Sequence, residues 1–123
     1  IEFIEKAAAI VHHINAGGIL VIDEIESSLH PKLVCFLNEY INGDQNKSAQ
    51  VIYTTHCYDL LNFKVSGLRH DQIYFTEKNK DQSTSLFTLA NFNERKDVSV
   101  YKKYFEGSYS LQNLENLQKG DIK

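Results

Sequence analysis

The 123-residue sequence contains no methionine and no tryptophan, a single proline and two cysteines. Because it has no methionine at all and opens inside a helical pattern, we expect a piece excised from a longer protein. Cys35 and Cys57 are too few and too far apart for a disulfide scaffold or a zinc ribbon. Cys35 falls within an apolar helical pattern, and we interpret it as a buried thiol.

The sequence also lacks an apolar run close to the ~20 residues that span a bilayer, and it lacks a signal-peptide pattern. We therefore expect a cytoplasmic protein with no membrane contact. Its net charge is −3, with the acids scattered, which does not favour a nucleic-acid-binding surface in this chain. Any nucleic-acid contact would have to come from missing regions. The length suits one domain or part of one.

The apolar periodicities that are present alternate between helix and strand. They predict an amphipathic helix over residues 1–15, a strand over 19–22, a helix that begins at Pro31 and closes at Asn42-Gly43, and a strand over 50–55. A short helix over 59–63, a hairpin over 72–77 and 83–90, and a helix around 98–105 follow. The predicted fold class is therefore α/β, with a parallel βαβ unit, flanking helices and a C-terminal antiparallel hairpin.

Two adjacent carboxylates, Asp23 and Glu24, come directly after the first predicted strand. The apolar run before them indicates a strand that is buried on both faces of a parallel sheet. A strand, a helix and a strand in succession form a βαβ unit, whose crossover is almost always right-handed, so the strand over 50–55 should run parallel to the first. The acids and His56 should then lie at the same sheet edge, the carboxyl edge at which α/β sheets bind ligands.

An apolar strand that ends in Asp-Glu resembles the Walker B motif of ATPases of the ABC, SMC and RecF type. Ser27-Ser28-Leu29-His30 falls at the position of their D-loop, and Thr54-Thr55-His56 at that of their switch histidine. The segment is most similar to the ABC-like AAA-type ATPases of bacterial phage-defence systems, which include RloC-like, abortive-infection and OLD-related proteins. The resemblance continues through Leu68–Lys78, Arg95–Asp97 and Tyr104–Tyr109.

This resemblance implies a domain division and a set of site residues. Residues 1–109 would be the C-terminal half of an ATPase head with a P-loop NTPase-like sheet, and 110–123 a polar tail. Asp23 would hold Mg²⁺ through water, and Glu24 would be the general base for the attacking water. His56 would donate a hydrogen bond to the γ-phosphate, although Cys57 departs from the residue that often follows in the family.

Ser27, Ser28 and His30 would, by the same resemblance, cross a dimer interface and touch the partner's nucleotide. The residues that the resemblance assigns to the site also have simpler interpretations, which stay open. Asp23 and Glu24 can be solvated acids at a strand end, and His56 can be an ordinary buried histidine. Ser28 or His30 can cap the helix that begins at Pro31.

A phosphate-binding loop of the form Gly-x-x-x-x-Gly-Lys-Ser/Thr is absent from the sequence, so the predicted domain is partial. In the family this loop lies well upstream. We therefore expect ATP and Mg²⁺ to be bound by the full-length protein, as a head-to-head homodimer that hydrolyses ATP in phage defence or a DNA-linked process. A nuclease or a toxin is the expected partner. The isolated chain should bind nucleotide poorly and be inactive.

Two other classes of function remain open at this stage. The chain can be an interaction or scaffold module, derived from such a head, that does not hydrolyse ATP. It can also be a metal-dependent nuclease in which Asp23, Glu24 and His56 are ligands, although two-metal nucleases need more carboxylates than this cluster offers.

Overall fold

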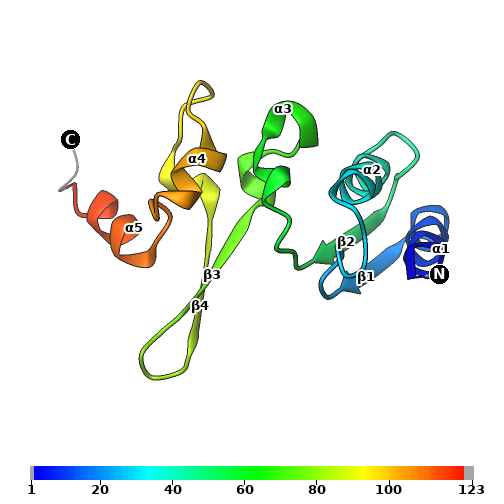
Figure 1. The fold of residues 1–123 in the computed structure, drawn as a ribbon, viewed down its shortest axis with the longest axis horizontal. Coiled ribbons are helices and arrows are strands. Elements are labelled where there is room, and N and C mark those ends of the chain that lie inside the picture. Colours follow the sequence, from blue (N-terminus) through cyan, green and yellow to red (C-terminus); the bar gives the residue numbers. More distant parts are fainter. Residues whose placement is uncertain (1, 121–123) are drawn as a thin grey trace. The chain divides into compact units, whose positions relative to one another are not determined.

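A computed structural model describes residues 2–120, which fall into two units. The first unit ends at residue 60 and is completed by Lys64–Gly67, whereas the second comprises Leu61–Phe63 and residues 68–120. Figure 1 shows the order of the elements along the chain. The first unit contains a pair of parallel strands and the second an antiparallel pair. The predicted α/β class is confirmed, and it is compatible with a partial P-loop-like domain.

The first helix, α1 (Glu2–Ala16), packs against both strands of the parallel sheet. Its apolar residues recur at helical spacing, and Ile10 and Ile14 are buried. The helix ends at Gly17, whose N–H donates to the carbonyl of His13 at 2.7 Å and whose φ is +83°. A Cβ atom on Gly17 would lie 2.7 Å from the Oγ of Ser48. The left-handed backbone therefore favours glycine here, and a Cβ atom would also displace the Ser48 hydroxyl.

Strands β1 (Gly18–Ile22) and β2 (Ala49–Tyr53) are parallel, and their register runs from Gly18 opposite Ala49 to Ile22 opposite Tyr53. The helix α2 (Pro31–Ile41) connects them. The predicted βαβ unit is thus confirmed. Because the strands are parallel and in register, the residues that follow Ile22 and Tyr53 leave the sheet at the same edge.

The prediction that β1 is buried on both faces is wrong for the described residues. Ile19, Val21 and Ile52 lie on one face of the sheet and are 65%, 70% and 51% exposed. The other face carries Leu20 and Ile22, which are half-buried. A continuous apolar run indicates that a strand has two apolar faces, but it does not say that the same chain covers both of them.

Helix α2 buries Leu37 and Ile41, as its periodicity predicts, and also Val34, whereas Phe36, which the same periodicity predicts to be buried, is 55% exposed. Cys35 on this helix and Cys57 beyond β2 are half-buried free thiols, and burial raises the pKa of both. The single helix expected over 59–63 is replaced by a 3₁₀ turn, η1 (Tyr58–Leu61), and a short helix, α3 (Phe63–Ser66). No helix within residues 2–120 is long and apolar enough to cross a membrane.

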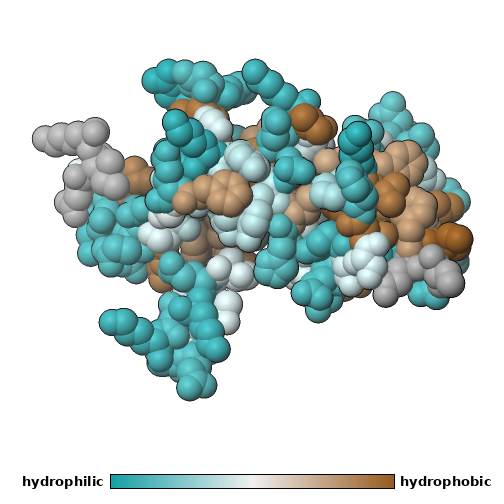
Figure 2. Space-filling view, viewed as in Figure 1, coloured by the Kyte–Doolittle hydropathy of each residue, from teal (hydrophilic) through white to brown (hydrophobic). Residues whose placement is uncertain are grey.

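The second unit is built on the predicted hairpin. After the turn η2 (His70–Gln72), strand β3 (Tyr74–Lys78) pairs with β4 (Thr84–Thr88), and η3 (Leu89–Phe92) follows. The hairpin loop is closed by the Asn79 N–H, which donates to the carbonyl of Ser83 at 2.8 Å. Figure 2 shows the end of this hairpin as a hydrophilic projection.

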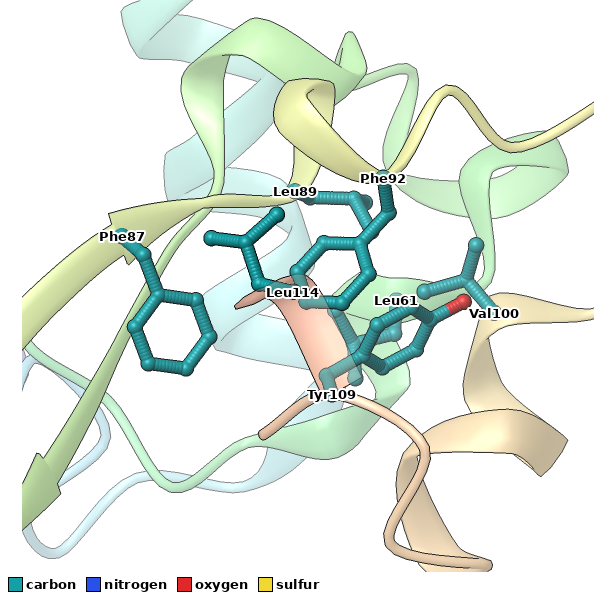
Figure 3. Packing of buried hydrophobic residues seen from close by; sticks show 7 residues of the cluster. All are labelled: Leu61, Phe87, Leu89, Phe92, Val100, Tyr109 and Leu114. Atoms are coloured by element: carbon teal, nitrogen blue, oxygen red, sulfur yellow. The ribbon is translucent and has the colours of Figure 1, made fainter. Parts of the chain in front are cut away.

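Helices α4 (Val100–Phe105) and α5 (Leu111–Gln118) complete the second unit. They contribute to a core in which the side chains of Phe92, Tyr109 and Leu114 point toward one another (Figure 3). The region predicted as a polar tail thus contains a helix that buries Leu114. Residues 121–123 of that tail lie outside the described residues, and the proposed boundary between 109 and 110 stays a prediction.

Candidate active site at the carboxyl edge of the parallel sheet

The hydrogen bonding between β1 and β2 continues beyond the last residue of each strand. The Thr54 N–H donates to the carbonyl of Ile22, and the Ile25 N–H donates to the carbonyl of Thr54, both at 3.0 Å. Asp23 and Glu24 lie between these two contacts, directly after the end of β1. The structure therefore places both predicted acids directly beside Thr54 at the carboxyl edge.

The Thr54 hydroxyl group connects the two acidic residues. Its oxygen donates to Oδ1 of Asp23 at 2.5 Å and accepts from the N–H of Glu24 at 2.8 Å. One oxygen of the Asp23 carboxylate is thereby held toward β2, and the carboxylate remains exposed. Thr54 is part of a sequence motif, but the motif does not predict these contacts. The available signal was its position at a strand end, two residues before His56.

Glu24 adopts a backbone conformation that is uncommon for a residue with a side chain. Its φ is +51°, in the left-handed region, where a non-glycine residue is strained by ~1–3 kcal/mol. Its carbonyl accepts from the Ser27 N–H at 2.9 Å, which closes a turn immediately after the strand. The left-handed residue turns the chain sharply away from the sheet, and the Glu24 side chain is exposed at this edge.

Glu26 links this turn to the segment that contains His56, and no sequence motif predicts this role. Its Oε1 accepts from the N–H of His56 at 2.5 Å, whereas its Oε2 is buried without a hydrogen-bond partner. Burial alone would raise the pKa of the Glu26 carboxyl. The N–H groups of His56 and of Glu26 itself, the nearby Thr55 hydroxyl and the charge of His56 together lower that pKa below its ordinary value. Glu26 is consequently ionised at neutral pH.

His56 follows β2 in an extended segment, and its side chain is exposed. Its backbone is fixed by Glu26. The neighbouring Thr55 hydroxyl accepts from the Cys57 N–H at 2.9 Å. The structure thus brings Asp23, Glu24 and His56 to one edge of the sheet, as the strand order predicts. The imidazole is available for a ligand that approaches this edge.

Ser27, Ser28 and His30 occupy the connection between the acidic turn and α2. The capping interpretation holds for His30, whose Nδ1 accepts from the Lys32 N–H at 3.1 Å in front of Pro31. Ser28 is exposed and has a φ of +61°, and Ser27 is exposed as well. Capping leaves the Nε2 of His30 available, so it does not conflict with the interface role that the resemblance implies for these three residues.

The described residues do not contain a cluster of side chains that could by itself hold a metal ion. Across residues 2–120, no group of three or more His, Cys, Asp and Glu side chains comes together in a geometry that could hold a metal ion. This finding does not decide the nuclease interpretation, in which Asp23, Glu24 and His56 would be joint ligands. It does not bear on a Mg²⁺ ion held mainly by water and substrate phosphates, because such a site needs only one or two carboxylates.

Comparison with known protein families gives a match over part of the chain. Residues 6–62 match the family described as "AAA domain, putative AbiEii toxin, Type IV TA system". The matched segment contains β1, α2 and β2 and all of the predicted site residues. No curated protein and no solved structure matches the chain.

Proposed function

We propose that this protein takes part in ATP binding and hydrolysis, because residues 6–62 match the AAA domain family whose description names a putative AbiEii toxin. The single observation that carries the proposal is the arrangement of Asp23, Glu24 and Thr54 at the carboxyl edge of the parallel sheet. His56 lies two residues further along, tied to the same turn by Glu26. Phosphoryl transfer requires such a set of carboxylates and hydrogen-bond donors placed around the phosphate.

Each side chain in this arrangement has a separate role in the proposal. Glu24 orients the attacking water and accepts its proton, a contribution of ~10²- to 10⁴-fold in rate. Thr54 holds the main chain of Glu24 and the carboxylate of Asp23 in fixed positions. His56 donates a hydrogen bond to an oxygen of the terminal phosphate, and Glu26 fixes the backbone from which the imidazole extends.

Asp23 is the residue proposed to hold Mg²⁺. Its carboxylate is exposed at the sheet edge with one oxygen engaged by Thr54, which fits an ion that keeps most of its waters. Mg²⁺ bound there would neutralise charge on the substrate phosphates. The main-chain cradle for those phosphates is not encoded in the 123 residues, since they contain no phosphate-binding loop. The proposal therefore places this loop elsewhere in the full-length protein.

We also propose an oligomeric state, a partner and a cellular compartment for the full-length protein. Ser27, Ser28 and His30 would contact a nucleotide bound to a second head in a head-to-head homodimer, and ATP turnover would control a nuclease or toxin partner in phage defence. Such an ATPase would work in the cytoplasm. The chain alone would bind nucleotide weakly.

ATP hydrolysis by the full-length protein tests the proposal, with wild type measured beside Glu24→Gln. The variant should retain ATP and lose at least ~10²-fold in kcat, because the amide cannot accept the proton of water. Glu39→Gln is the matched control, since Glu39 is an exposed acid on α2 away from the sheet edge. Turnover by Glu24→Gln at the wild-type rate would refute the assignment of the base.

The same assay separates ATP hydrolysis from the scaffold alternative. If wild type, Glu24→Gln and Glu39→Gln all fail to hydrolyse ATP, while the full-length protein still binds a partner, the chain functions as an interaction module. If only Glu24→Gln is inactive, the carboxyl edge of the parallel sheet is the catalytic centre.

A further inference from the structure

A lysine from α1 reaches the backbone of the acidic turn. The Nζ of Lys6 donates to the carbonyl oxygens of Glu24 at 3.3 Å, Ile25 at 3.1 Å and Ser27 at 3.1 Å. An ammonium group has three N–H donors, so each donor of Lys6 has an acceptor in this one turn. A lysine on a surface helix would ordinarily extend into solvent, whereas Lys6 is half-buried against residues 18 to 21 positions away.

The carbonyls that Lys6 binds are those of an otherwise unfavourable turn. Glu24 and Ser28 both have left-handed backbones without being glycine, and several carbonyl dipoles in this turn point toward the same place. Converging carbonyl oxygens repel one another unless a cation or donor lies between them. The ammonium group of Lys6 supplies that charge, so it offsets the strain of the conformation in which Glu24 is presented at the sheet edge.

Two other hydrogen bonds hold the turn, and both come from the segment after β2. Ile25 is fully buried, and its N–H is bonded to the carbonyl of Thr54. Glu26 is bonded to the N–H of His56. Both of these contacts attach the turn to the segment after β2, whereas Lys6 is its attachment to α1. Lys6 thus contributes three hydrogen bonds from α1 to the turn that contains Glu24.

We propose that Lys6 is a positioning residue, which sets the backbone of residues 23–29 and thereby the place of the Glu24 carboxylate. The catalytic consequence rests on the proposed function, in which Glu24 is the general base. The structural part does not, since it concerns only the conformation of the turn. Neither part requires Lys6 to touch nucleotide.

Amide hydrogen exchange, followed by NMR, tests the structural part on the chain itself. Lys6→Met removes the charge and the donors but keeps a similar apolar stem. It should accelerate exchange of the Ser27 and Leu29 amides, which are bonded within the turn, by about tenfold, the effect expected when one charge-assisted contact is lost. Amides of β1 and β2 should keep wild-type rates. Lys47→Met, which alters an exposed lysine in the loop before β2, is the matched control and should leave the turn unchanged.

Two results overturn the structural part. One is unchanged exchange of Ser27 and Leu29 in Lys6→Met. The other is equal acceleration throughout β1 and β2, which would mean that Lys6 stabilises the unit as a whole. Lys6→Arg keeps the charge and the donors in a different shape, and it should restore part of the protection at both amides. If Lys6→Met does not fold, the proposal requires Lys6→Arg to show faster exchange than wild type in the turn and wild-type rates in the sheet.

ATP turnover by the full-length protein tests the catalytic consequence. A displaced general base lowers kcat, by up to ~10²-fold for a shift of about 1 Å, while KM changes little. We expect this split for Lys6→Met and partial recovery of kcat in Lys6→Arg. A raised KM with unchanged kcat would instead place Lys6 in nucleotide binding and overturn its positioning role. If wild type itself shows no turnover, the proposed function fails, and the exchange experiment still decides whether Lys6 sets the turn.

Discussion

At the scale of single residues, the candidate site depends on side chains that connect its two halves. Thr54 connects Asp23 to Glu24, and Glu26 connects the acidic turn to His56. Neither residue stands out by type, because threonine and glutamate are common at the ends of strands and in turns. Their roles follow from the particular atoms that they contact.

Replacing Thr54 by valine tests the bridging hydroxyl. Valine keeps the branched shape, but it can neither donate to Asp23 nor accept from the Glu24 N–H. We expect Thr54→Val to lower the free energy of unfolding by ~1 kcal/mol, the usual net value of an intramolecular hydrogen bond. Thr54→Ser retains the hydroxyl and should lose less. Urea denaturation measures both, and equal stability of the two variants would show that the hydroxyl does not bridge these groups.

The low pKa of Glu26 predicts a dependence of stability on pH. Because the pKa of this carboxyl is lower in the folded protein than its ordinary 4.5, its stabilising contribution is complete above about pH 4.5. It is lost as the pH falls through the folded-state pKa. Glu26→Gln removes the charge and keeps the size, so it should be less stable than wild type at neutral pH. The difference should shrink in acid.

Urea denaturation of wild type and Glu26→Gln above and below pH 4.5 measures this difference. Other acids titrate in the same range, but they do so in both proteins and largely cancel in the comparison. A difference that stays constant with pH would contradict the ionised state and the contact with His56.

At the scale of elements, α2 is attached by a buried polar residue. Asn38 is fully buried, and its Nδ2 donates to the carbonyl of Ser66 at 2.8 Å. Its Oδ1 accepts from the hydroxyl of Tyr53 at 2.8 Å, which links α2 to the end of β2. Burial, followed by the nearby Cys57 and Cys35, raises the pKa of Tyr53 to about 12, so this hydroxyl stays protonated and remains a donor.

Tyr53→Phe tests this attachment of α2 to β2. The ring is preserved and only the hydroxyl is lost, so we expect a decrease of ~1 kcal/mol in the free energy of unfolding. Asn38→Ala should cost more, because it removes the contacts to both the Tyr53 hydroxyl and the Ser66 carbonyl from a buried site. Chemical denaturation checks the order of the two variants, and a Tyr53→Phe protein as stable as wild type would contradict the contact.

Most of the helices and strands could be predicted from the sequence. The exposure of one face of the parallel sheet could not. Periodicity located α1, β1, α2, β2 and the β3–β4 hairpin, because an amphipathic face leaves a repeat in the sequence. It did not reveal that Ile19, Val21 and Ile52 are exposed. Whether a face is covered depends on which other elements are present, and the repeat within one strand contains no such information.

At the scale of the whole molecule, the second unit has a core of its own, which includes Phe87, Leu89 and Leu114. Leu89 is fully buried there, whereas Leu86 on β4 is 66% exposed. Leu89→Ala should lower the free energy of unfolding of this unit by ~2–5 kcal/mol, through lost burial and the cavity left behind. Leu86→Ala is the matched control and should cost within ~0.5 kcal/mol.

Denaturation followed by tyrosine fluorescence measures both leucine variants, because the protein has no tryptophan and Tyr109 lies in this core. A similar small loss for Leu89→Ala and Leu86→Ala would contradict the assignment of the core.

The sequence by itself determined the order of α1, β1, α2, β2 and the β3–β4 hairpin, the parallel direction of β1 and β2, and hence the common edge of Asp23, Glu24 and His56. These features follow from local periodicity and from the strand–helix–strand order of the βαβ unit, which short stretches of chain encode. Only the tertiary structure decided that Thr54 bridges the acids, that Glu26 holds His56 and that Lys6 binds the turn. These contacts join residues 18 to 31 positions apart, and they depend on the left-handed turn at Glu24, which no repeat in the sequence announces.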